Sequence, residues 1–329
     1  MRPRSARTAL AALTAALTAA ACLTAAAPAA ARHSRACSPA VSLAGYTDAL
    51  DKTTYDGTYV GNLSALAPDR RRTLAALSDR SALFRLDART LAPRSVVTLA
   101  DENGAALDAE GLVVDRDGTY LVSSETEPTV RRYSRDGARI LHRLPVPDDL
   151  RPAPGGRARG NGTFEGLTLL PGGRTLLAAM EYPLAGDPAD LVRFQTWQRT
   201  WRGDFRLGRQ YAYRVDPGLG VSEVTAAPDG RLLVLERGWT AGVGNTVRLY
   251  LADLRRPTAA KRILADLADC PSLGAPAGQP QPNPLLDNLE GMAVTGRTHG
   301  RLDVVLVSDD NQNTAQITRF LRLRVRVRG

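Results

Sequence analysis

The fold is decided by a stretch that begins Ala109-Glu-Gly-Leu-Val-Val-Asp-Arg-Asp-Gly118 and ends Val122-Ser-Ser-Glu125. It consists of a short apolar run, a turn-prone Asp-Gly pair and a second apolar run, which is the pattern of a β-hairpin. Related segments begin at Leu63, Phe164, Ser222 and Leu289. A hairpin repeated five times along the chain indicates a repeat architecture rather than two unrelated domains.

The spacing of the hairpins indicates which repeat fold they build. Their starts at residues 64, 110, 165, 223 and 290 are 46, 55, 58 and 67 residues apart. A four-stranded propeller blade takes about 40–50 residues, and longer spacings leave room for inserted loops. We therefore predict an all-β protein, a β-propeller with five blades visible in the sequence and room for a sixth. The alternating run Leu321–Val327 is expected to close the ring against a strand near Thr54–Val60.

Each of the last four hairpins begins and ends with an acidic residue. In the hairpin from Glu110 to Glu125 the arithmetic centre falls between Asp117 and Gly118, at the turn, and the other three hairpins are centred in the same way. Residues equidistant from the turn of an antiparallel hairpin face each other on one side of the sheet. Two carboxylates are therefore expected side by side at the open end of each hairpin.

If all hairpins point the same way, their open ends meet at one rim of the propeller. This rim would collect nine carboxylates: Asp79, Glu110, Glu125, Glu165, Glu181, Glu223, Glu236, Glu290 and Asp309. So many like charges cannot all stay ionised unaided, and hard cations such as Ca²⁺ bind carboxylate oxygens. A structural role, in which the acids hold the blades together through backbone amides, stays open for any single residue. The first hairpin departs from the pattern with Ser64.

The N-terminal residues 1–31 have the composition of a secretory signal peptide. Three arginines precede the apolar run Thr8–Leu23, and the small residues Ala29–Ala31 form a cleavage site. Residues 32–58 are then an N-terminal segment and residues 59–329 the propeller domain. Lipid attachment at Cys22 is a second interpretation, since Ala19–Cys22 resembles a lipoprotein box without its usual leucine. No later run reaches the ~18 apolar residues of a membrane span. Both interpretations predict an exported protein.

Cysteine usage agrees with export. Removal of the signal leaves Cys37 and Cys270, an even number in an oxidising compartment. A disulfide between them is favoured over a reactive thiol, because neither cysteine lies in a motif or near a histidine.

Several chemistries are disfavoured by the composition. The chain carries three histidines, His33, His142 and His299, so a histidine-centred phosphatase or a multi-histidine zinc site is not expected. A Gly-x-Ser-x-Gly elbow, a P-loop and a dinucleotide glycine motif are all missing from the sequence. The formal charge is +9, with 41 arginines beside Lys52 and Lys261. We interpret most of these arginines as solvated surface, and expect a monomer that binds no nucleic acid.

The repeated motifs are similar to those of a known family. Asp108-Ala-Glu-Gly-Leu112, Phe164-Glu-Gly-Leu-Thr-Leu-Leu-Pro171, Asn288-Leu-Glu-Gly-Met-Ala293 and Leu306-Val-Ser-Asp-Asp-Asn311 resemble the phytase-like domain, also called the esterase-like activity of phytase family. The resemblance covers about Tyr59 to Val327. It implies a secreted propeller whose repeated Glu and Asp residues are the seat of a phosphoesterase activity.

The first hypothesis is a phosphoesterase assisted by Ca²⁺ that hydrolyses a small phosphorylated substrate. Its expected catalytic residues are Glu165, Glu181, Glu223 and Glu236. Arg159 and Arg237 are expected to clamp the phosphate, because guanidinium groups fit phosphate oxygens. The expected metal ligands are Glu110, Glu125, Glu290, Asp309, Asp310 and Asn311.

Two alternatives stay open. One is a non-catalytic extracellular binding propeller that is stabilised by calcium. The other is a lactonase-like propeller, which also holds a metal through acids in its channel.

Overall fold

The structure is a computed structural model that describes residues 35–70 and 72–327. The predicted signal peptide and Cys22 lie outside the described residues. Among the described residues, the secondary structure is strands with two short 3₁₀ turns, η1 (Asp148–Leu150) and η2 (Leu267–Asp269). No helix in this part of the chain has the length and apolar character to cross a membrane.

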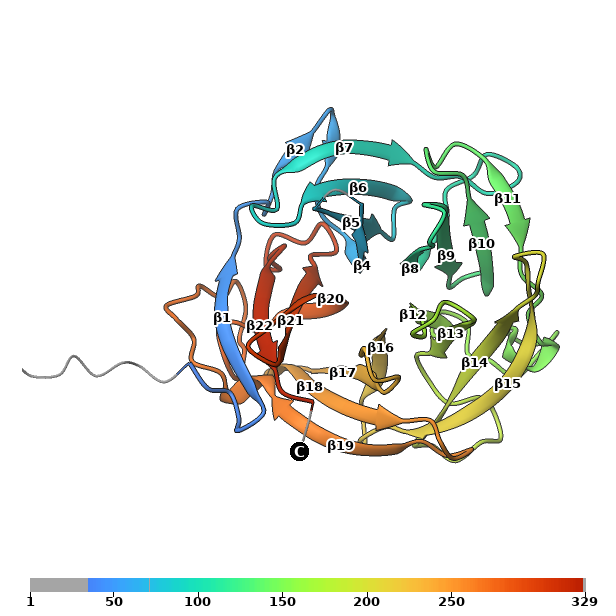
Figure 1. Cartoon of the computed structure of the whole chain (residues 1–329). Coiled ribbons are helices and arrows are strands. Elements are labelled where there is room, and N and C mark those ends of the chain that lie inside the picture. The colour runs from blue at the N-terminus through green and yellow to red at the C-terminus, as the bar shows by residue number, and fades with distance from the viewer. Residues whose placement is uncertain (1–34, 71, 328–329) are drawn as a thin grey trace, which may run out of the picture. The chain divides into compact units, whose positions relative to one another are not determined.

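Five four-stranded antiparallel sheets stand around a central axis as the blades of a propeller (Figure 1). Blade 1 contains β4 (Leu63–Asp69), β5 (Thr73–Ser78), β6 (Ala82–Asp87) and β7 (Pro93–Thr98). Blade 2 contains β8 (Ala109–Val114), β9 (Tyr120–Ser124), β10 (Thr129–Tyr133) and β11 (Ile140–Arg143). Blade 3 contains β12 (Phe164–Leu169), β13 (Thr175–Met180), β14 (Leu191–Arg199) and β15 (Phe205–Arg214). Blade 4 contains β16 (Gly220–Ala226), β17 (Leu232–Thr240), β18 (Gly244–Asp253) and β19 (Ala260–Asp266). Blade 5 contains β20 (Asn288–Thr298), β21 (Arg301–Asp309), β22 (Phe320–Val325) and β1 (Val41–Thr47).

Blade 5 closes the ring with strands from both ends of the described chain. β1 pairs with β22 in antiparallel register, with Leu43 opposite Leu323. The predicted closing strand near Thr54–Val60 was wrong, since this stretch forms only the two-residue strands β2 (Thr54–Tyr55) and β3 (Thr58–Tyr59), which pair with each other. β1 can close the blade because its alternating side chains Val41 and Leu43 are fully buried. The described residues form no sixth four-stranded sheet, so five blades are correct.

The predicted disulfide is present. Cys37 lies just before β1 and Cys270 just after η2, and their sulfurs are bonded across a sequence separation of 233 residues. The bond ties the closing strand of blade 5 to the end of blade 4. A cross-link over so long a loop constrains the unfolded chain strongly.

The turns of the inner hairpins lie where the sequence predicted them. Gly118 and Gly230 both adopt a left-handed backbone, with φ of +85° and +87°. Tight hairpin turns require positive φ, which glycine adopts without a steric penalty. The open ends of all five inner hairpins consequently meet at the opposite face of the propeller.

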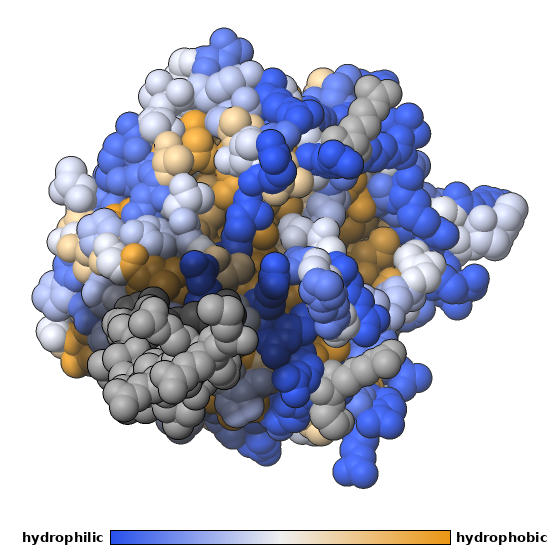
Figure 2. Space-filling model, turned by 60° about the vertical axis from the view of Figure 1, so that its left-hand side comes forward, coloured by the Kyte–Doolittle hydropathy of each residue, from blue (hydrophilic) through white to orange (hydrophobic). Residues whose placement is uncertain are grey.

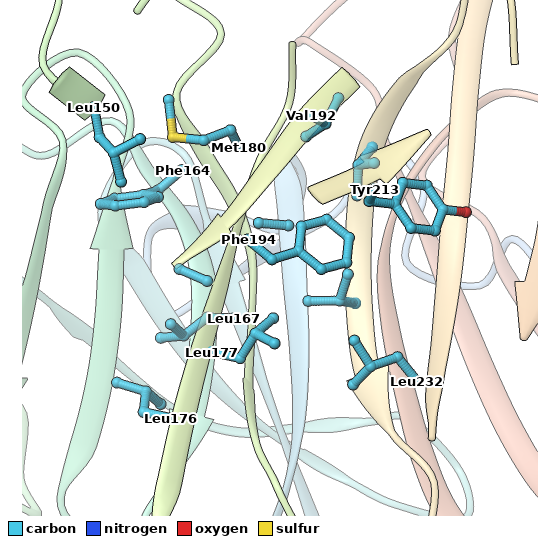
Figure 3. Packing of buried hydrophobic residues seen from close by; sticks show 14 of the residues in the cluster. Leu150, Phe164, Leu167, Leu176, Leu177, Met180, Val192, Phe194, Tyr213 and Leu232 are labelled. Carbon is cyan, nitrogen blue, oxygen red and sulfur yellow. The ribbon is translucent and has the colours of Figure 1, made fainter. Parts of the chain in front are cut away.

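Apolar side chains fill the spaces between neighbouring blades. Phe194 and Tyr213 of blade 3 stack with their ring centres 5.0 Å apart, and Met180 and Phe164 lie beside Leu150, which follows blade 2 (Figure 3). On the face shown in Figure 2, hydrophilic residues protrude and apolar residues lie recessed between them. The blades therefore form a rigid frame for the residues at the axis.

Candidate functional site

The open ends of the inner hairpins surround a cavity of about 550 Å³, which we call the acidic cup. Its walls are almost entirely polar side chains. The carboxyl groups in its lining are Asp79, Asp108, Glu110, Glu125, Glu165, Glu181, Glu290 and Asp309. Its guanidinium groups are Arg80, Arg159 and Arg237. Seven of the nine predicted carboxylates therefore meet at one rim.

A β-bulge near the start of each inner strand supplies the first set of these side chains. The register of every inner hairpin shifts at the same place, in blade 5 between Leu289 and Gly291. The residues at this place are Ser64, Glu110, Glu165, Ser222 and Glu290. A bulge inserts an extra residue and re-aims its side chain, which is why bulges recur beside binding sites.

The second set lies at the open end of the second strand of each blade: directly after the strand in blades 1, 2 and 3, at its last residue in blade 5, and within the longer strand of blade 4. In blades 1, 2, 3 and 5 this position carries Asp79, Glu125, Glu181 and Asp309, and in blade 4 it carries Arg237. Because of the bulge, the two acids of a hairpin are not opposite each other in the strand register. Oxygens of Glu110 and Glu125, and of Glu165 and Glu181, nevertheless lie within 4.8 Å of one another, so the predicted side-by-side carboxylates are confirmed in blades 2 and 3. The amide of Glu125 donates to the carbonyl of Asp108 at 2.9 Å, so Glu125 faces Asp108 rather than Glu110.

The predicted ring of carboxylates is wrong in blade 4. Val221 pairs with Glu236, and the bulge lies at Ser222. Glu223 therefore comes one residue too late and Glu236 one residue too early to face the cup. Because side chains alternate along a strand, a shift of one residue turns them to the opposite face. The prediction that these two carboxylates join the ring was wrong.

Both misplaced carboxylates are buried and satisfied inside the protein. Glu236 accepts hydrogen bonds from the Tyr213 hydroxyl and from the Lys261 ammonium, each at 2.6 Å. Glu223 accepts one from the amide of Val224 at 2.8 Å, and the amides of two neighbouring inner strands, at Leu167 and Met292, also donate to it. Glu223 and Glu236 therefore have a structural role inside the protein, which the sequence left open for any single acid.

Asp310 also lies outside the cup. Its carboxylate accepts hydrogen bonds from the Lys52 ammonium at 2.7 Å, from the Asn62 amide at 3.0 Å and from the Tyr59 hydroxyl. Burial opposes ionisation of this group, but the hydrogen bonds from Lys52 and Tyr59 outweigh it and lower the pKa of Asp310. The predicted metal ligand thus anchors the segment before blade 1. Asn311 does line the cup.

The predicted phosphate-binding arginines both reach the cup. Arg237 lies between two carboxylates, with its Nη2 at 3.2 Å from Glu290 Oε1 and 3.7 Å from Glu181 Oε1. Its buried Nε has no hydrogen-bond partner. The guanidinium of Arg159 lies 4.9 Å from the ring centre of Tyr182.

Burial and mutual repulsion make the cup carboxyls harder to ionise than free carboxyl groups. Burial is the larger cause and raises the pKa of Asp79 and Glu125 to about 7 and that of Asp309 to about 6. The same two causes raise the pKa of Glu110 and Glu165 well above the usual range. The buried carboxyls therefore retain their protons to higher pH than free carboxyl groups do, unless a cation neutralises them.

The pKa of Arg237 is also raised, which in a guanidinium favours the charged form. Its burial would lower the pKa, but the nearby carboxylates of Glu290, Glu181 and Glu165 raise it overall. The guanidinium is consequently a permanent positive charge in the cup.

Two groups of three carboxylates have the geometry of cation sites. One oxygen each of Asp108, Glu110 and Glu125 lie within 4.8 Å of one another, and the same holds for Glu125, Glu165 and Glu181. Glu125 belongs to both groups, is 4% exposed, and its Oε1 has no hydrogen-bond partner. Carboxylate oxygens are the ligands of hard divalent cations, so these residues fit Ca²⁺ or Mg²⁺.

The sequence missed two members of the cup that a comparison of the motifs could have found. Asp108 and Asn288 each stand two residues before a bulged glutamate and line the cavity. Asp108 faces Glu125 and Asn288 faces Asp309, each at the open end of the second strand. The shared spacing Asp108-Ala-Glu110 and Asn288-Leu-Glu290 was the available signal.

Residues 58–312 match the model of the family described as phytase-like, esterase-like activity of phytase. The chain belongs to this phytase-like family. The matched range contains every residue that lines the cup, from Ser64 to Asn311. The cup is therefore built from the part of the chain that defines the family.

Other similarities are more distant. An uncharacterized secreted protein of Arthroderma benhamiae is 26% identical over 181 residues, which cover 42% of this chain and 35% of that protein. The alignment thus spans about a third of that relative's length. A gluconolactonase structure from Xanthomonas campestris aligns with a TM-score of 0.46 at 16% identity, over 82% of this phytase-like chain and 73% of the other. A second structure, provisionally assigned as a gluconolactonase, aligns with a TM-score of 0.44 at 15% identity, over 80% and 75% of the two chains.

Proposed function

We propose that this phytase-like protein is an exported hydrolase that cleaves a phosphate ester in the acidic cup with the help of a bound divalent cation, Ca²⁺ in particular. The observation that carries the proposal is the pair of carboxylate groups that share Glu125, whose buried Oε1 has no partner. Membership in the phytase-like family supports ester hydrolysis as the reaction class.

The proposed cation ligands during hydrolysis are the carboxylates of Asp108, Glu110 and Glu125. The second group, Glu125, Glu165 and Glu181, would hold a cation only when Glu165 and Glu181 are both ionised. On the other side of the cup, Glu290, Asp309 and Asn311 supply further oxygens. When bound, the cation would polarise the phosphoryl group and lower the pKa of a coordinated water.

The protein's own groups would bind and orient the ester. Arg237 and Arg159 are the candidates to bind the phosphoryl oxygens, since both guanidinium groups face the cavity and fit them geometrically. Hydrolysis adds water across the P–O bond, so one proton must reach the leaving oxygen. Burial raises the pKa of Glu165 well above its usual range, so Glu165 is our candidate to donate it. Glu181, held beside Arg237, is our candidate to accept the proton of the attacking water.

A non-catalytic binding propeller is the second candidate, and one observation favours it. The two carboxylate groups draw their members from blades 2 and 3, so a bound cation would join neighbouring blades. Such a cation would stabilise the fold even without turnover.

Phosphate release separates the two candidates. Purified protein would be given a monoester, a diester and inositol hexakisphosphate, with calcium first chelated and then restored. The enzyme proposal expects turnover that returns with calcium and is lost in Glu125→Gln, while Glu127→Gln, at a side chain 60% exposed, serves as the matched control. An increase in melting temperature with calcium, without turnover on any ester, would instead support the non-catalytic binding propeller.

Export is proposed on separate grounds. The first 31 residues predict a signal peptide, the chain contains a disulfide, and the relative from Arthroderma benhamiae is named as secreted. Mass spectrometry of the mature protein tests it. A chain that begins at Arg32 supports signal cleavage, a lipid-modified N-terminal Cys22 supports the anchored alternative, and an intact Met1 contradicts both.

A further inference from the structure

A second polar cavity, of about 570 Å³, lies on the face of the propeller opposite the cup. Three turns form it: β8–β9, β12–β13 and β14–β15. The first two follow the inner strands β8 and β12, whose starts carry Glu110 and Glu165 in the cup. The cavity is lined by Arg116, Arg132, Arg174, Arg199 and Arg202, and we call it the arginine pocket.

Two of the arginines are fixed in place by a buried carboxylate. The Asp115 side chain is 1% exposed and accepts hydrogen bonds from Arg132 Nη2 and Arg199 Nη2, both at 2.8 Å. The two guanidinium groups also pack on Phe205, at 5.7 Å and 4.4 Å from its ring centre. Arg199 Nε further donates to the carbonyl of Gly173 at 2.7 Å, which joins two of the three turns. This wall of the pocket is therefore organised before any ligand arrives.

The other three arginines are available to a ligand. Within residues 35–70 and 72–327, no carboxylate lies within 4.0 Å of the guanidinium groups of Arg116, Arg174 or Arg202, and all three side chains are exposed. The lining contains five guanidinium groups against the carboxylates of Asp115, Asp117 and Asp204. An excess of positive charge thus faces the solvent.

The pocket contains two further features of a binding site. Trp201 is 88% exposed, and the Arg202 guanidinium lies 4.7 Å from its ring centre. The buried hydroxyl of Thr200 has no hydrogen-bond partner. An exposed tryptophan leaves a large apolar surface in water, which is unusual away from an interaction site.

We propose that the arginine pocket binds an anionic polysaccharide. Guanidinium groups bind carboxylate, sulfate or phosphate groups in bidentate geometry. The flat face of Trp201 fits the apolar face of a sugar ring. A single-stranded nucleic acid is disfavoured because such ligands stack on several aromatic side chains along a charged groove. Here Trp201 is the one exposed aromatic side chain in the lining.

This site is independent of the cup and of the proposed hydrolysis. Its residues come from the turns, whereas the cup is built at the open ends of the same hairpins. A polysaccharide bound here would leave the cup free, so Glu125→Gln should not alter the binding.

The test measures binding of dextran sulfate and polygalacturonate, with neutral dextran as the reference polymer. The triple variant Arg116→Ala/Arg174→Ala/Arg202→Ala should weaken binding by about tenfold or more, because it removes three charged hydrogen-bond donors that face the solvent. The control is Arg139→Ala/Arg256→Ala/Arg326→Ala, which removes the same charge from exposed arginines outside the pocket. The control should bind nearly as tightly as the parent.

Tryptophan fluorescence supplies a second readout. In a Trp239→Phe background, Trp201 is the exposed indole and Trp197 is buried, so the anionic polymers should change the emission and Trp201→Ala should abolish the change. Equal losses in the two triple variants would mean non-specific attraction by net charge and would overturn the proposal. Tighter binding of a single-stranded oligonucleotide than of either anionic polysaccharide would overturn it too.

Discussion

Arg237 lies 3.2 Å from Glu290, at the position of blade 4 where each of the other four blades carries an acid. The cup is therefore not a symmetric ring of negative charge. Its carboxylate groups with cation geometry lie in blades 2 and 3, and its central guanidinium comes from blade 4. Under our proposal, this division would place cation ligands beside a phosphate-binding arginine, which suits a ligand that is a metal-bound phosphate.

The stability of the metal-free protein should fall as the pH rises from about 4 to 8. Asp79 and Glu125 have folded-state pKa values of about 7 and Asp309 of about 6, above their ordinary values of 3.8 or 4.5. A group whose pKa is raised on folding stabilises the protein below its unfolded pKa, and this stability is lost as the pH passes the folded pKa. Thermal melting in EDTA should show a decrease of several degrees, since about 1 kcal/mol shifts Tm by roughly 2–4 °C in a large domain. A flat or rising profile would contradict protonated cup carboxyls.

Calcium should reverse this trend, and Glu125 should matter most to its affinity. Cations bind ionised carboxylates, so the increase in Tm with calcium should be larger at pH 8 than at pH 5. Glu125→Gln removes a ligand from both carboxylate groups, whereas Glu110→Gln and Glu181→Gln each affect one. Isothermal titration should show the greatest loss of affinity for Glu125→Gln. Equal losses in the three variants would argue against a shared ligand.

Glu236 should be required for stability and not for hydrolysis. Its fully buried carboxylate pairs with Lys261 and Tyr213, and removing one partner of a buried ion pair costs about 3–5 kcal/mol. Glu236→Ala should therefore unfold at much lower denaturant concentration, whereas its folded fraction should keep the parent's kcat. The double variant with Lys261→Met should lose less than the sum of the single changes, because it leaves no unpaired charge. If the Glu236→Ala variant had the stability of the parent but no turnover, Glu236 would be a catalytic residue after all.

The blades and their turns were predictable because both depend on local pattern. Apolar alternation and the Asp-Gly turns at Gly118 and Gly230 define a hairpin without reference to the rest of the chain. The closing strand β1 was not predictable, since its pairing with β22 joins residues that are more than 270 positions apart in the sequence. A short alternating strand has no local feature that identifies its partner.

The cup was predictable as a set and not residue by residue. Counting from the turn placed the carboxylates at the correct end, but a β-bulge adds a residue that leaves no mark in the sequence. In blade 4 the acids at Glu223 and Glu236 are each offset by one residue from the other blades, and one residue decides which face a side chain occupies. The similarity of the repeats suggested that Glu223 and Glu236 correspond to the cup acids of the other blades. The strand register shows that Ser222 and Arg237 occupy those positions instead.

The disulfide should contribute most to stability through the closure of the ring. Cys37 adjoins β1, which pairs with β22 at the outer edge of blade 5, so the bond fixes the start of this strand to the end of blade 4. Reduction, or the variant Cys37→Ala/Cys270→Ala, should destabilise the protein by about 2–5 kcal/mol. Hydrogen exchange should locate the loss of protection in β1 and β22 rather than in blades 2 and 3. Unchanged exchange in β1 would show that strand pairing alone closes the ring.

Replacing Arg237 should separate its binding role from a structural one, because the two roles predict opposite effects on calcium. Burial raises the pKa of Glu181 and Glu290, and the guanidinium of Arg237 opposes this increase; the same positive charge repels cations. In Arg237→Gln, KM for a phosphate ester should rise by about tenfold or more, since a hydrogen bond to a charged group is worth roughly 1.5–3 kcal/mol. Calcium should bind more tightly to the same variant, because one positive charge has left the cup. Arg237→Lys should recover part of the ester affinity, since it restores the charge without the planar fork. If ester affinity and calcium affinity fell together, with a lower Tm, Arg237 would be a residue that holds the blades together. The proposal that this arginine binds the phosphate would then be wrong.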